Sequence, residues 1–314
     1  MNTFSFEVKQ EILKKRYDAS CCAISSLCAV IETLAEIVFR NGKMTVSLTI
    51  DHDDMFEFVV ETIEKFYGKI DEESEIHVTK RVGNDRREWI LSPQLGERLL
   101  FDTGIVSFEN GTMKINRHIE RNLVMEDCCK IAYLSHAFAG SGTVSLPSEG
   151  SGGYHMEWSS SNEEMCSDIA QLLTEFGVLP KIVRRNDKFV VYIKDRETIS
   201  DLLARFGAVK SMLRMAEAQA ERDLRNRINR GANCMTANIS KTVDASAKQL
   251  SAIAVIEQTI GLDGLSDALK EMALARKNDP SASLSALAEK LGISKSAVRA
   301  RLDNLMALAE SLEQ

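Results

Sequence analysis

The sequence predicts an α+β protein of 314 residues, in which a duplicated α-β-β-α-β-β domain precedes an all-helical domain. In the front two thirds, the same succession of helix-type and strand-type segments occurs twice. The strand-type segments alternate apolar and polar residues, which is the period of a half-buried strand. The remainder, from about residue 233, has no such alternation, and glycine and proline divide it into helical stretches.

The first half of the duplicated domain is predicted over residues 1–115. It contains the dipeptide Cys21-Cys22, and similar elements follow the second dipeptide, Cys128-Cys129. The periodicity of the first half predicts helices and strands in a fixed order. These segments are the helix CAISSLCAVIETLAEI, the strand MTVSLTI, the helix MFEFVVETIEKFYGKI, the strands EIHVTKR and REWILS, and the helix PQLGERLLF.

The second half is predicted over residues 116–208 and repeats this order. Met55 and Met165 hold similar places in the two copies, and so do Phe66 and Phe176, and Gly68 and Gly177. The corresponding segments are the helix KIAYLSHAFAGSG, the strands TVSL and YHMEWSS, the helix MCSDIAQLLTEFGVLPKI, the strands PKIVRR and KFVVYIK, and the helix TISDLLARF. We interpret the two halves as an internal duplication.

A charged connecting helix is predicted over residues 209–232, because neither glycine nor proline interrupts the sequence from Val209 until Gly231. The final domain is predicted over residues 233–314. Glycine or proline at positions 261, 264, 280 and 292 separates its helical stretches.

The charge of the chain is unevenly distributed. Its formal net charge is −7, but residues 205–314 hold 16 lysines and arginines against 13 acidic residues, and residues 1–204 hold 23 against 33. Because phosphate is attracted to basic surfaces and repelled by acidic ones, we expect nucleic-acid contacts mainly in the last third. A chain of this length exceeds the usual size of one hydrophobic core, so two or three domains are expected.

The sequence also indicates where in the cell the protein is located. No stretch approaches the roughly 18 uncharged apolar residues of a membrane span, and Glu7 and Glu11 stand where a signal peptide would be apolar. We therefore expect a cytoplasmic, nucleoid-associated protein with no membrane partner. Its seven cysteines are an odd number without the dense spacing of a secreted scaffold, and they are interpreted as reduced thiols.

A helix-turn-helix is predicted in the segment SLSALAEKLGISKSAVRARLDNL. Its first helix has an apolar stripe, Gly292 supplies the turn, and Ser294 caps a second helix. The start of this second helix can present side chains to base edges, with Arg299 as the first choice for reading a guanine and Lys295 for holding phosphate. The alternative is a solvated helical hairpin. The candidate DNA-binding residues are Ser283, Ser294, Lys295, Ser296, Arg299, Arg301 and Asn304.

A second basic group precedes this segment and admits two interpretations. Its side chains either add a phosphate-binding surface beside the recognition helix, or face water and pair with acidic residues of the front domain. The residues are Arg225, Arg227, Arg230, Lys241 and Lys248.

A wider pattern is carried by four segments, namely FSFEVKQEI, KFVVYIKDRETISDLLARFGA, NRINRGANCMTANISKTVDASAKQ and LGISKSAVRARL. Together they resemble the WhiA family of bacterial regulators of sporulation and cell division. The resemblance implies a front domain with the LAGLIDADG homing-endonuclease fold, joined to a helix-turn-helix domain that binds double-stranded promoter DNA and regulates transcription.

The same resemblance places the two acidic positions of the nuclease site at Glu32 and Ala139. Cleavage requires a carboxylate from each half to hold divalent ions, and alanine cannot ligate a metal. We therefore expect no nuclease activity and no catalytic residues, and we interpret Glu32 as a solvated or capping residue. Small residues in the second helix allow two helices to approach closely. They are Ala137, Ala139, Gly140 and Gly142.

The front domain is then expected to serve as a scaffold that orients the DNA-binding domain, pairs subunits or receives another protein. The alternative function for the whole chain is an interaction protein, whose acidic front docks a regulatory or cell-division partner and which binds DNA weakly.

No metal or cofactor is predicted. Adjacent cysteines are not the C-x₂₋₄-C spacing of structural zinc sites, and no histidine cluster accompanies them. Burial in the core or a place at the start of a helix is the preferred interpretation of both cysteine pairs. The segment GSGTVS lacks the lysine of a phosphate-binding loop.

Overall fold

The computed structural model describes residues 3–40, 42–80, 85–147 and 153–313. The chain forms two compact units, Met1–Gln219 and Ala220–Gln314. Each unit has a hydrophobic core of its own. None of the described helices combines the length and the apolar composition that a membrane-crossing segment requires.

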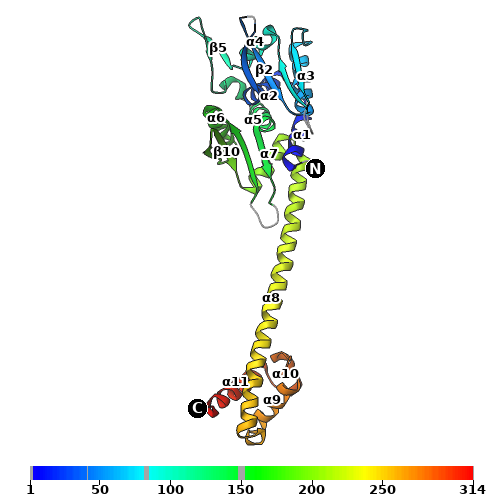
Figure 1. Ribbon diagram of the computed structural model, residues 1–314, viewed down its shortest axis with the longest axis vertical. Helices are drawn as coiled ribbons and strands as arrows, with labels where there is room; N and C mark the ends of the chain where they lie inside the picture. Colours follow the sequence, from blue (N-terminus) through cyan, green and yellow to red (C-terminus); the bar gives the residue numbers. More distant parts are fainter. Residues whose placement is uncertain (1–2, 41, 81–84, 148–152, 314) are drawn as a thin grey trace. The chain divides into compact units, whose positions relative to one another are not determined.

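The first half of the first unit contains a four-stranded antiparallel sheet with the order β1-β2-β4-β3 (Figure 1). Strand β2 is buried along nearly its whole length, because helices cover it and its neighbours pair with it on both edges. The elements are α1 (Phe4–Leu13), α2 (Ser20–Leu34), β1 (Ala35–Arg40), β2 (Lys43–Ile50), α3 (Asp53–Tyr67), β3 (Glu75–Thr79), β4 (Arg86–Ile90) and α4 (Pro93–Asp102).

The second half repeats this arrangement. Its four strands pair in the order β7-β8-β10-β9, which is the order of the first sheet with each strand replaced by its counterpart. The elements are α5 (Asp127–Ser141), β7 (Gly142–Ser145), β8 (His155–Ser160), α6 (Glu163–Glu175), β9 (Lys181–Arg185), β10 (Lys188–Ile193) and α7 (Arg196–Phe206). The predicted α+β class with a duplicated front domain is thus confirmed.

Several details differ from the sequence prediction. Helix α1 was not predicted, and the predicted helix that runs to Ile182 ends as α6 at Glu175, with Ile182 in β9. The first predicted helix includes Ile37, whereas α2 ends at Leu34 and the chain continues as β1, where Ile37, Val38 and Phe39 pair with β2. β-Branched and aromatic side chains favour this strand. The hairpin of β5 (Val106–Glu109) and β6 (Thr112–Ile115), followed by the short 3₁₀ helix η1 (Arg121–Val124), was not predicted.

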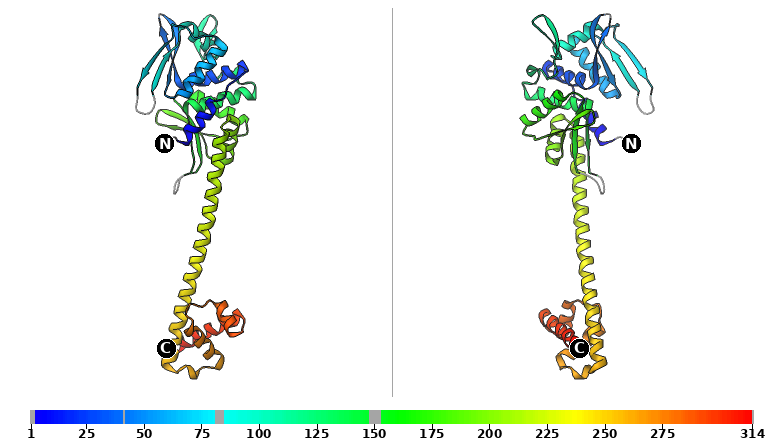
Figure 2. Two further views of the ribbon diagram at one scale, coloured as in Figure 1. Left: turned by 90° about the vertical axis from the view of Figure 1, so that its right-hand side faces the viewer. Right: turned by 60° about the vertical axis from the view of Figure 1, so that its left-hand side comes forward.

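The α2–α5 pair forms the centre of the first unit, where the two halves meet (Figures 1 and 2). Gly140 allows this close approach: a Cβ atom there would lie 2.8 Å from Cβ of Thr33 and closer still to its hydroxyl oxygen. Ala137 and Ala139 are buried in the same core. The small residues of α5 therefore serve the packing role expected from the sequence.

Helix α8 (Val209–Thr259) starts in the first unit, where α1 holds its first turn. The Glu11 carboxylate accepts hydrogen bonds from the backbone N–H groups of Lys210 and Ser211, both at 2.8 Å, and Glu7 pairs with Arg214. A carboxylate at a helix N-terminus is favourable because of the helix dipole. The two acidic residues near the start of the chain thus anchor α8.

In the second unit, α8 packs with three further helices around a compact core. The sequence prediction ends the connecting helix at residue 232, whereas α8 continues through Gly231 to Thr259. One glycine costs a helix only about 1 kcal/mol, which the flanking residues offset. The predicted ranges 1–115, 116–208, 209–232 and 233–314 remain predictions. The other elements are η2 (Leu262–Gly264), α9 (Asp267–Asn278), α10 (Leu284–Leu291) and α11 (Lys295–Leu312).

Candidate nucleic-acid interface

A sharp turn joins α10 to α11. The Ser283 hydroxyl caps α10 by accepting from the N–H of Ala286 at 3.2 Å, and Leu287 is buried in the core of the unit. Gly292 ends α10 in the left-handed conformation, with φ of 64°, and the N–H of Ile293 donates back to the carbonyl of Ala288 at 3.1 Å. This C-terminal motif fixes the angle at which the next helix leaves.

Helix α11 begins at the cap that the sequence predicted. The Ser294 hydroxyl accepts from the N–H of Ala297 at 3.2 Å and lies 2.9 Å from the hydroxyl of Ser296. Val298, Leu302 and Leu305 are buried. The apolar face therefore holds the helix to its unit, and the opposite face is free to meet a ligand.

The start of that opposite face carries polar and basic side chains. Lys295, Ser296, Arg299 and Asn304 are exposed. The Arg299 side chain is 76% exposed, and its only ion pair among the described residues is with Asp303, at 3.9 Å on the same helix. Such an exposed, long contact contributes little free energy, so the guanidinium is available to another partner.

Arg301 lies elsewhere. Two residues along an α-helix are separated by roughly 200° of rotation, so Arg301 and Arg299 cannot face the same surface. The Arg301 guanidinium donates to the Glu271 carboxylate at 3.3 Å and to the Ala268 carbonyl at 3.4 Å, both on α9. The structure thus separates Arg301 from Lys295, Ser296 and Arg299 and gives it a contact that joins α11 to α9. Asn304 is exposed but lies about 140° from Arg299 around the helix and about 60° from Arg301.

A buried arginine supports the same motif and was not identified from the sequence. Arg276 on α9 is 2% exposed, and its Nη1 donates to the Ala282 carbonyl at 2.7 Å, just before α10. Burial lowers the pKa of this guanidinium. The Ser246 hydroxyl of α8 donates to the Pro280 carbonyl at 2.5 Å in the same turn. Only the tertiary contacts distinguish these two residues from ordinary polar side chains.

The five basic candidates of α8 are all exposed, but they do not share one side. At about 100° per residue, Arg227, Arg230, Lys241 and Lys248 fall within roughly 60° of one another around the helix. Arg225 lies about 160° from them and has an interaction partner of its own. Within the described residues, none of the four forms an ion pair. They therefore form one basic stripe along α8.

The two degenerate nuclease positions lie at the C-terminal ends of the paired helices α2 and α5. Glu32 is half-buried rather than fully solvated, and its carboxylate accepts a hydrogen bond from the Tyr133 hydroxyl. Burial raises the pKa of Glu32 to about 7, although the Tyr133 hydroxyl opposes this shift. The side chain belongs to the contact between the two halves.

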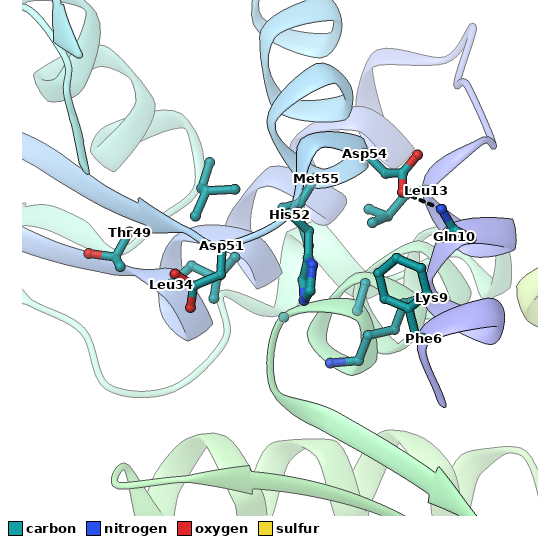
Figure 3. Close-up of a pocket in the computed structure, with 13 residues that line it drawn as sticks. Phe6, Lys9, Gln10, Leu13, Leu34, Thr49, Asp51, His52, Asp54 and Met55 are labelled. Atoms are coloured by element: carbon teal, nitrogen blue, oxygen red, sulfur yellow. Dashed lines mark hydrogen bonds between the residues drawn. The ribbon is translucent and has the colours of Figure 1, made fainter. Parts of the chain in front are cut away.

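Ala139 lines a cavity of about 110 Å³ beside these helix ends (Figure 3). The Gln10 amide donates to the Asp54 carboxylate at 2.8 Å on its wall, and burial lowers the pKa of Lys9 to about 8. Asp51 lies near Arg86, at 3.9 Å. Among the described residues, no three His, Cys, Asp or Glu side chains gather here closely enough to hold an ion.

Comparison with known proteins identifies both units. The family model for the WhiA LAGLIDADG-like domain matches residues 130–225, and that for the WhiA C-terminal HTH domain matches residues 228–309. The first match covers most of the second half of the front domain and the start of α8, and the second covers the helix-turn-helix.

Relatives that align over the whole length of the chain support the same family. A probable cell division protein WhiA from Thermoanaerobacter pseudethanolicus is 32% identical over 317 residues, covering 99% of this chain and 98% of the relative. One from Clostridium beijerinckii is 32% identical over 316 residues, with the same coverage. The crystal structure of full-length WhiA from Thermotoga maritima aligns over 99% of both chains with a TM-score of 0.60 at 20% identity, which shows the shared fold. The chain belongs to the WhiA family.

Proposed function

We propose that this protein is a sequence-specific DNA-binding transcription regulator that acts in cell division and, where the organism sporulates, in sporulation. The observation that carries the proposal is the exposed, capped start of α11, which presents Lys295, Ser296 and Arg299 on a rigid three-helix support. The relatives are named probable cell division proteins. Promoter DNA in the nucleoid is the proposed partner.

Each exposed residue has a role that its chemistry supports. The exposed guanidinium of Arg299 can donate two hydrogen bonds to one guanine. The Asn304 amide could bond an adenine edge only if DNA reached the other side of α11, so its base contact is the weaker part of the proposal. Lys295 and the hydroxyls of Ser283, Ser294 and Ser296 suit phosphate contacts near helix N-termini, where the dipole favours anions. Arg301, which is already bonded to Glu271, positions α11 against α9.

The basic stripe of α8 is proposed to add phosphate contacts. Its four side chains share one side of the helix and have no acidic partner among the described residues. The alternative interpretation is that these exposed residues only face water, and the salt dependence of DNA binding distinguishes the two. Because phosphate contacts release counterions, this surface would strengthen binding to any sequence and make it sensitive to salt.

The front domain is proposed to orient or assemble the regulator rather than to cut DNA. It is the acidic part of the chain, so a regulatory or cell-division protein with a basic surface is a more suitable partner for it than a phosphate backbone.

Selective binding to genomic DNA tests the proposal. The full chain, the Arg299→Ala variant and a Lys270→Ala control are mixed with fragmented genomic DNA at two salt concentrations, and retained fragments are sequenced. Lys270 matches Arg299 in charge but is paired with Asp263 at the start of α9. We expect the wild type and the control to enrich the same fragments.

Loss of one bidentate base contact should weaken specific binding by about 1–3 kcal/mol while leaving non-specific binding nearly unchanged. Enrichment should therefore disappear in the Arg299→Ala variant alone. If all three proteins retain fragments equally, and high salt removes them equally, the chain touches DNA without reading it. The interaction-protein alternative would then replace the regulator.

A further inference from the structure

Four cysteines meet at the N-terminal ends of α2 and α5, away from the degenerate nuclease positions. Cys21 and Cys22 lie in the first turn of α2, and Cys128 and Cys129 lie in the first turn of α5. The two helices pack together along their length. The internal duplication therefore places the same dipeptide on both sides of one contact.

The distances between the sulfur atoms fit a tetrahedral metal site. Sγ of Cys22 lies 3.9 Å from Sγ of Cys129, which lies 4.0 Å from Sγ of Cys128. The sulfur atoms of Cys21, Cys22 and Cys129 all lie within 4.8 Å of one another. Zinc–sulfur bonds of about 2.3 Å in a tetrahedron separate the sulfurs by roughly 3.8 Å. Three ligands are thus almost in place.

The cluster is both supported and accessible. Cys22 and Cys129 are 5% and 3% exposed, and they pack with the buried Ala132. Cys21 and Cys128 are exposed. An ion could enter from the side of the exposed pair and be held against the buried pair. Cys128, which is next to both buried thiols, can complete the tetrahedron by rotation of its side chain.

The local electrostatics favour thiolates once a cation is present. Neither Ala19 nor Glu126, the residues before the two helices, caps its helix with a side chain. The positive ends of both helix dipoles therefore lie near the cysteines of these first turns, which stabilises negative sulfur.

The Tyr17 hydroxyl supplies a further polar group beside the sulfurs. It is buried and forms no hydrogen bond of ordinary geometry within the described residues, although Ser135 lies near it. The Tyr17 side chain packs against the cluster of Cys22, Cys129 and Ala132. A phenol that donates to a coordinating sulfur is the type of supporting contact that metal sites use.

Sequence spacing alone argued against zinc, because adjacent cysteines within one segment are not the usual ligand pattern. The usual C-x₂₋₄-C spacing describes two ligands that come from one short segment. Here the second pair comes from the other half of the duplication, 107 residues along the chain.

We propose that Cys21, Cys22 and Cys129, with Cys128 as the fourth ligand, form a thiolate site for Zn²⁺ that links the two halves of the front domain. Binding releases the thiol protons to solvent. The proposal is independent of the DNA-binding function.

Metal titration of the full chain tests this site. Protein purified under reducing conditions is freed of metal with a chelator and titrated with Zn²⁺ against a chromophoric competitor, and with Co²⁺ to observe sulfur-to-metal charge-transfer absorption. The variants are the exposed-pair change Cys21→Ser/Cys128→Ser and the buried-pair change Cys22→Ser/Cys129→Ser. Cys234→Ser removes an exposed cysteine of α8 and serves as the control. Circular dichroism checks that each variant folds.

The expected result is one tightly bound Zn²⁺ per chain in the wild type and in Cys234→Ser. Thiolate charge-transfer bands should accompany Co²⁺, and Zn²⁺ should raise the thermal midpoint of unfolding. Both paired variants should lose the bands and bind at least tenfold more weakly. Folded wild type without stoichiometric Zn²⁺, or paired variants with unchanged affinity, would overturn the proposal. A Cys22–Cys129 disulfide in protein isolated from cells without reductant, together with no bound metal, would overturn it in favour of a redox link.

Discussion

Two residues bear on whether the front domain could cut DNA. The resemblance to the WhiA family predicts the acidic nuclease positions at Glu32 and Ala139. The half-buried Glu32 carboxylate accepts a hydrogen bond from Tyr133 of the other half, and Ala139 has no carboxylate to offer. Glu32 is therefore part of the contact between the two halves.

The raised pKa of Glu32 predicts a pH-dependent stability. The folded protein keeps a proton that the unfolded chain releases between about pH 4.5 and pH 7, so this group lowers the free energy of unfolding as pH rises through that window. Glutamine is neutral throughout. Glu32→Gln should therefore gain stability relative to wild type between pH 5 and pH 8, by roughly 3 kcal/mol.

Urea unfolding of both proteins at several pH values measures this difference. Cys28 and Asp168 lie near Glu32 and are common to both proteins, so their effects largely cancel. Glu36→Gln, at an exposed position on β1, is the control and should show no such trend. A constant difference between Glu32→Gln and wild type at all pH values would contradict the raised pKa of Glu32.

At the level of helices and strands, the close packing of α2 against α5 depends on the small residue Gly140. A Cβ atom at position 140 would meet both Cβ and the hydroxyl oxygen of Thr33. Gly140→Ala should therefore destabilise the first unit by about 1–3 kcal/mol, although alanine is the better helix former.

The matched control for this substitution is Gly231→Ala in α8, where a Cβ atom would meet nothing within 4 Å. That change should be neutral or stabilise the helix by up to about 1 kcal/mol. Chemical denaturation of both variants gives the comparison. Equal effects would show that the helices do not approach as closely as Thr33 and Gly140 indicate.

The basic stripe of α8 leads to a prediction about the salt dependence of DNA binding. If Arg227 and Arg230 bind phosphate, their joint replacement by alanine should reduce the slope of log affinity against log salt by about 2, at any DNA sequence. Arg225→Ala is the control, because Arg225 faces away from the stripe and has its own partner. Filter binding at a series of salt concentrations measures the slope. An unchanged slope and affinity would mean that the stripe is only solvated.

For the whole molecule, the central prediction is that DNA is bound and not cut. Only one of the two positions that would hold divalent ions has a carboxylate, and that carboxylate faces Tyr133. Intact chain incubated with plasmid and genomic DNA in Mg²⁺ or Mn²⁺ should leave the substrates whole on a gel. Products made by the wild type and absent with Glu32→Gln would show a working site despite Ala139.

The sequence by itself determined the features that depend on local pattern. Hydrophobic period and the order of segments predicted the duplicated α+β domain, and Ser294 and Gly292 predicted the start and the turn of the recognition helix. These features follow from contacts between residues only a few positions apart, so the sequence displays them directly. The Asn110-Gly111 turn of the β5–β6 hairpin carried the same kind of signal, with both residues at positive φ, and could have been predicted.

Only the tertiary structure decided the features that join distant segments. It placed the half-buried Glu32 beside Tyr133, paired Arg301 with Glu271, and extended α8 beyond Gly231. It also brought the two cysteine pairs together across the α2–α5 contact. Burial and ligand geometry depend on which surfaces meet after folding. The local sequence of one half therefore cannot predict that the cysteine pair of the other half will lie beside its own.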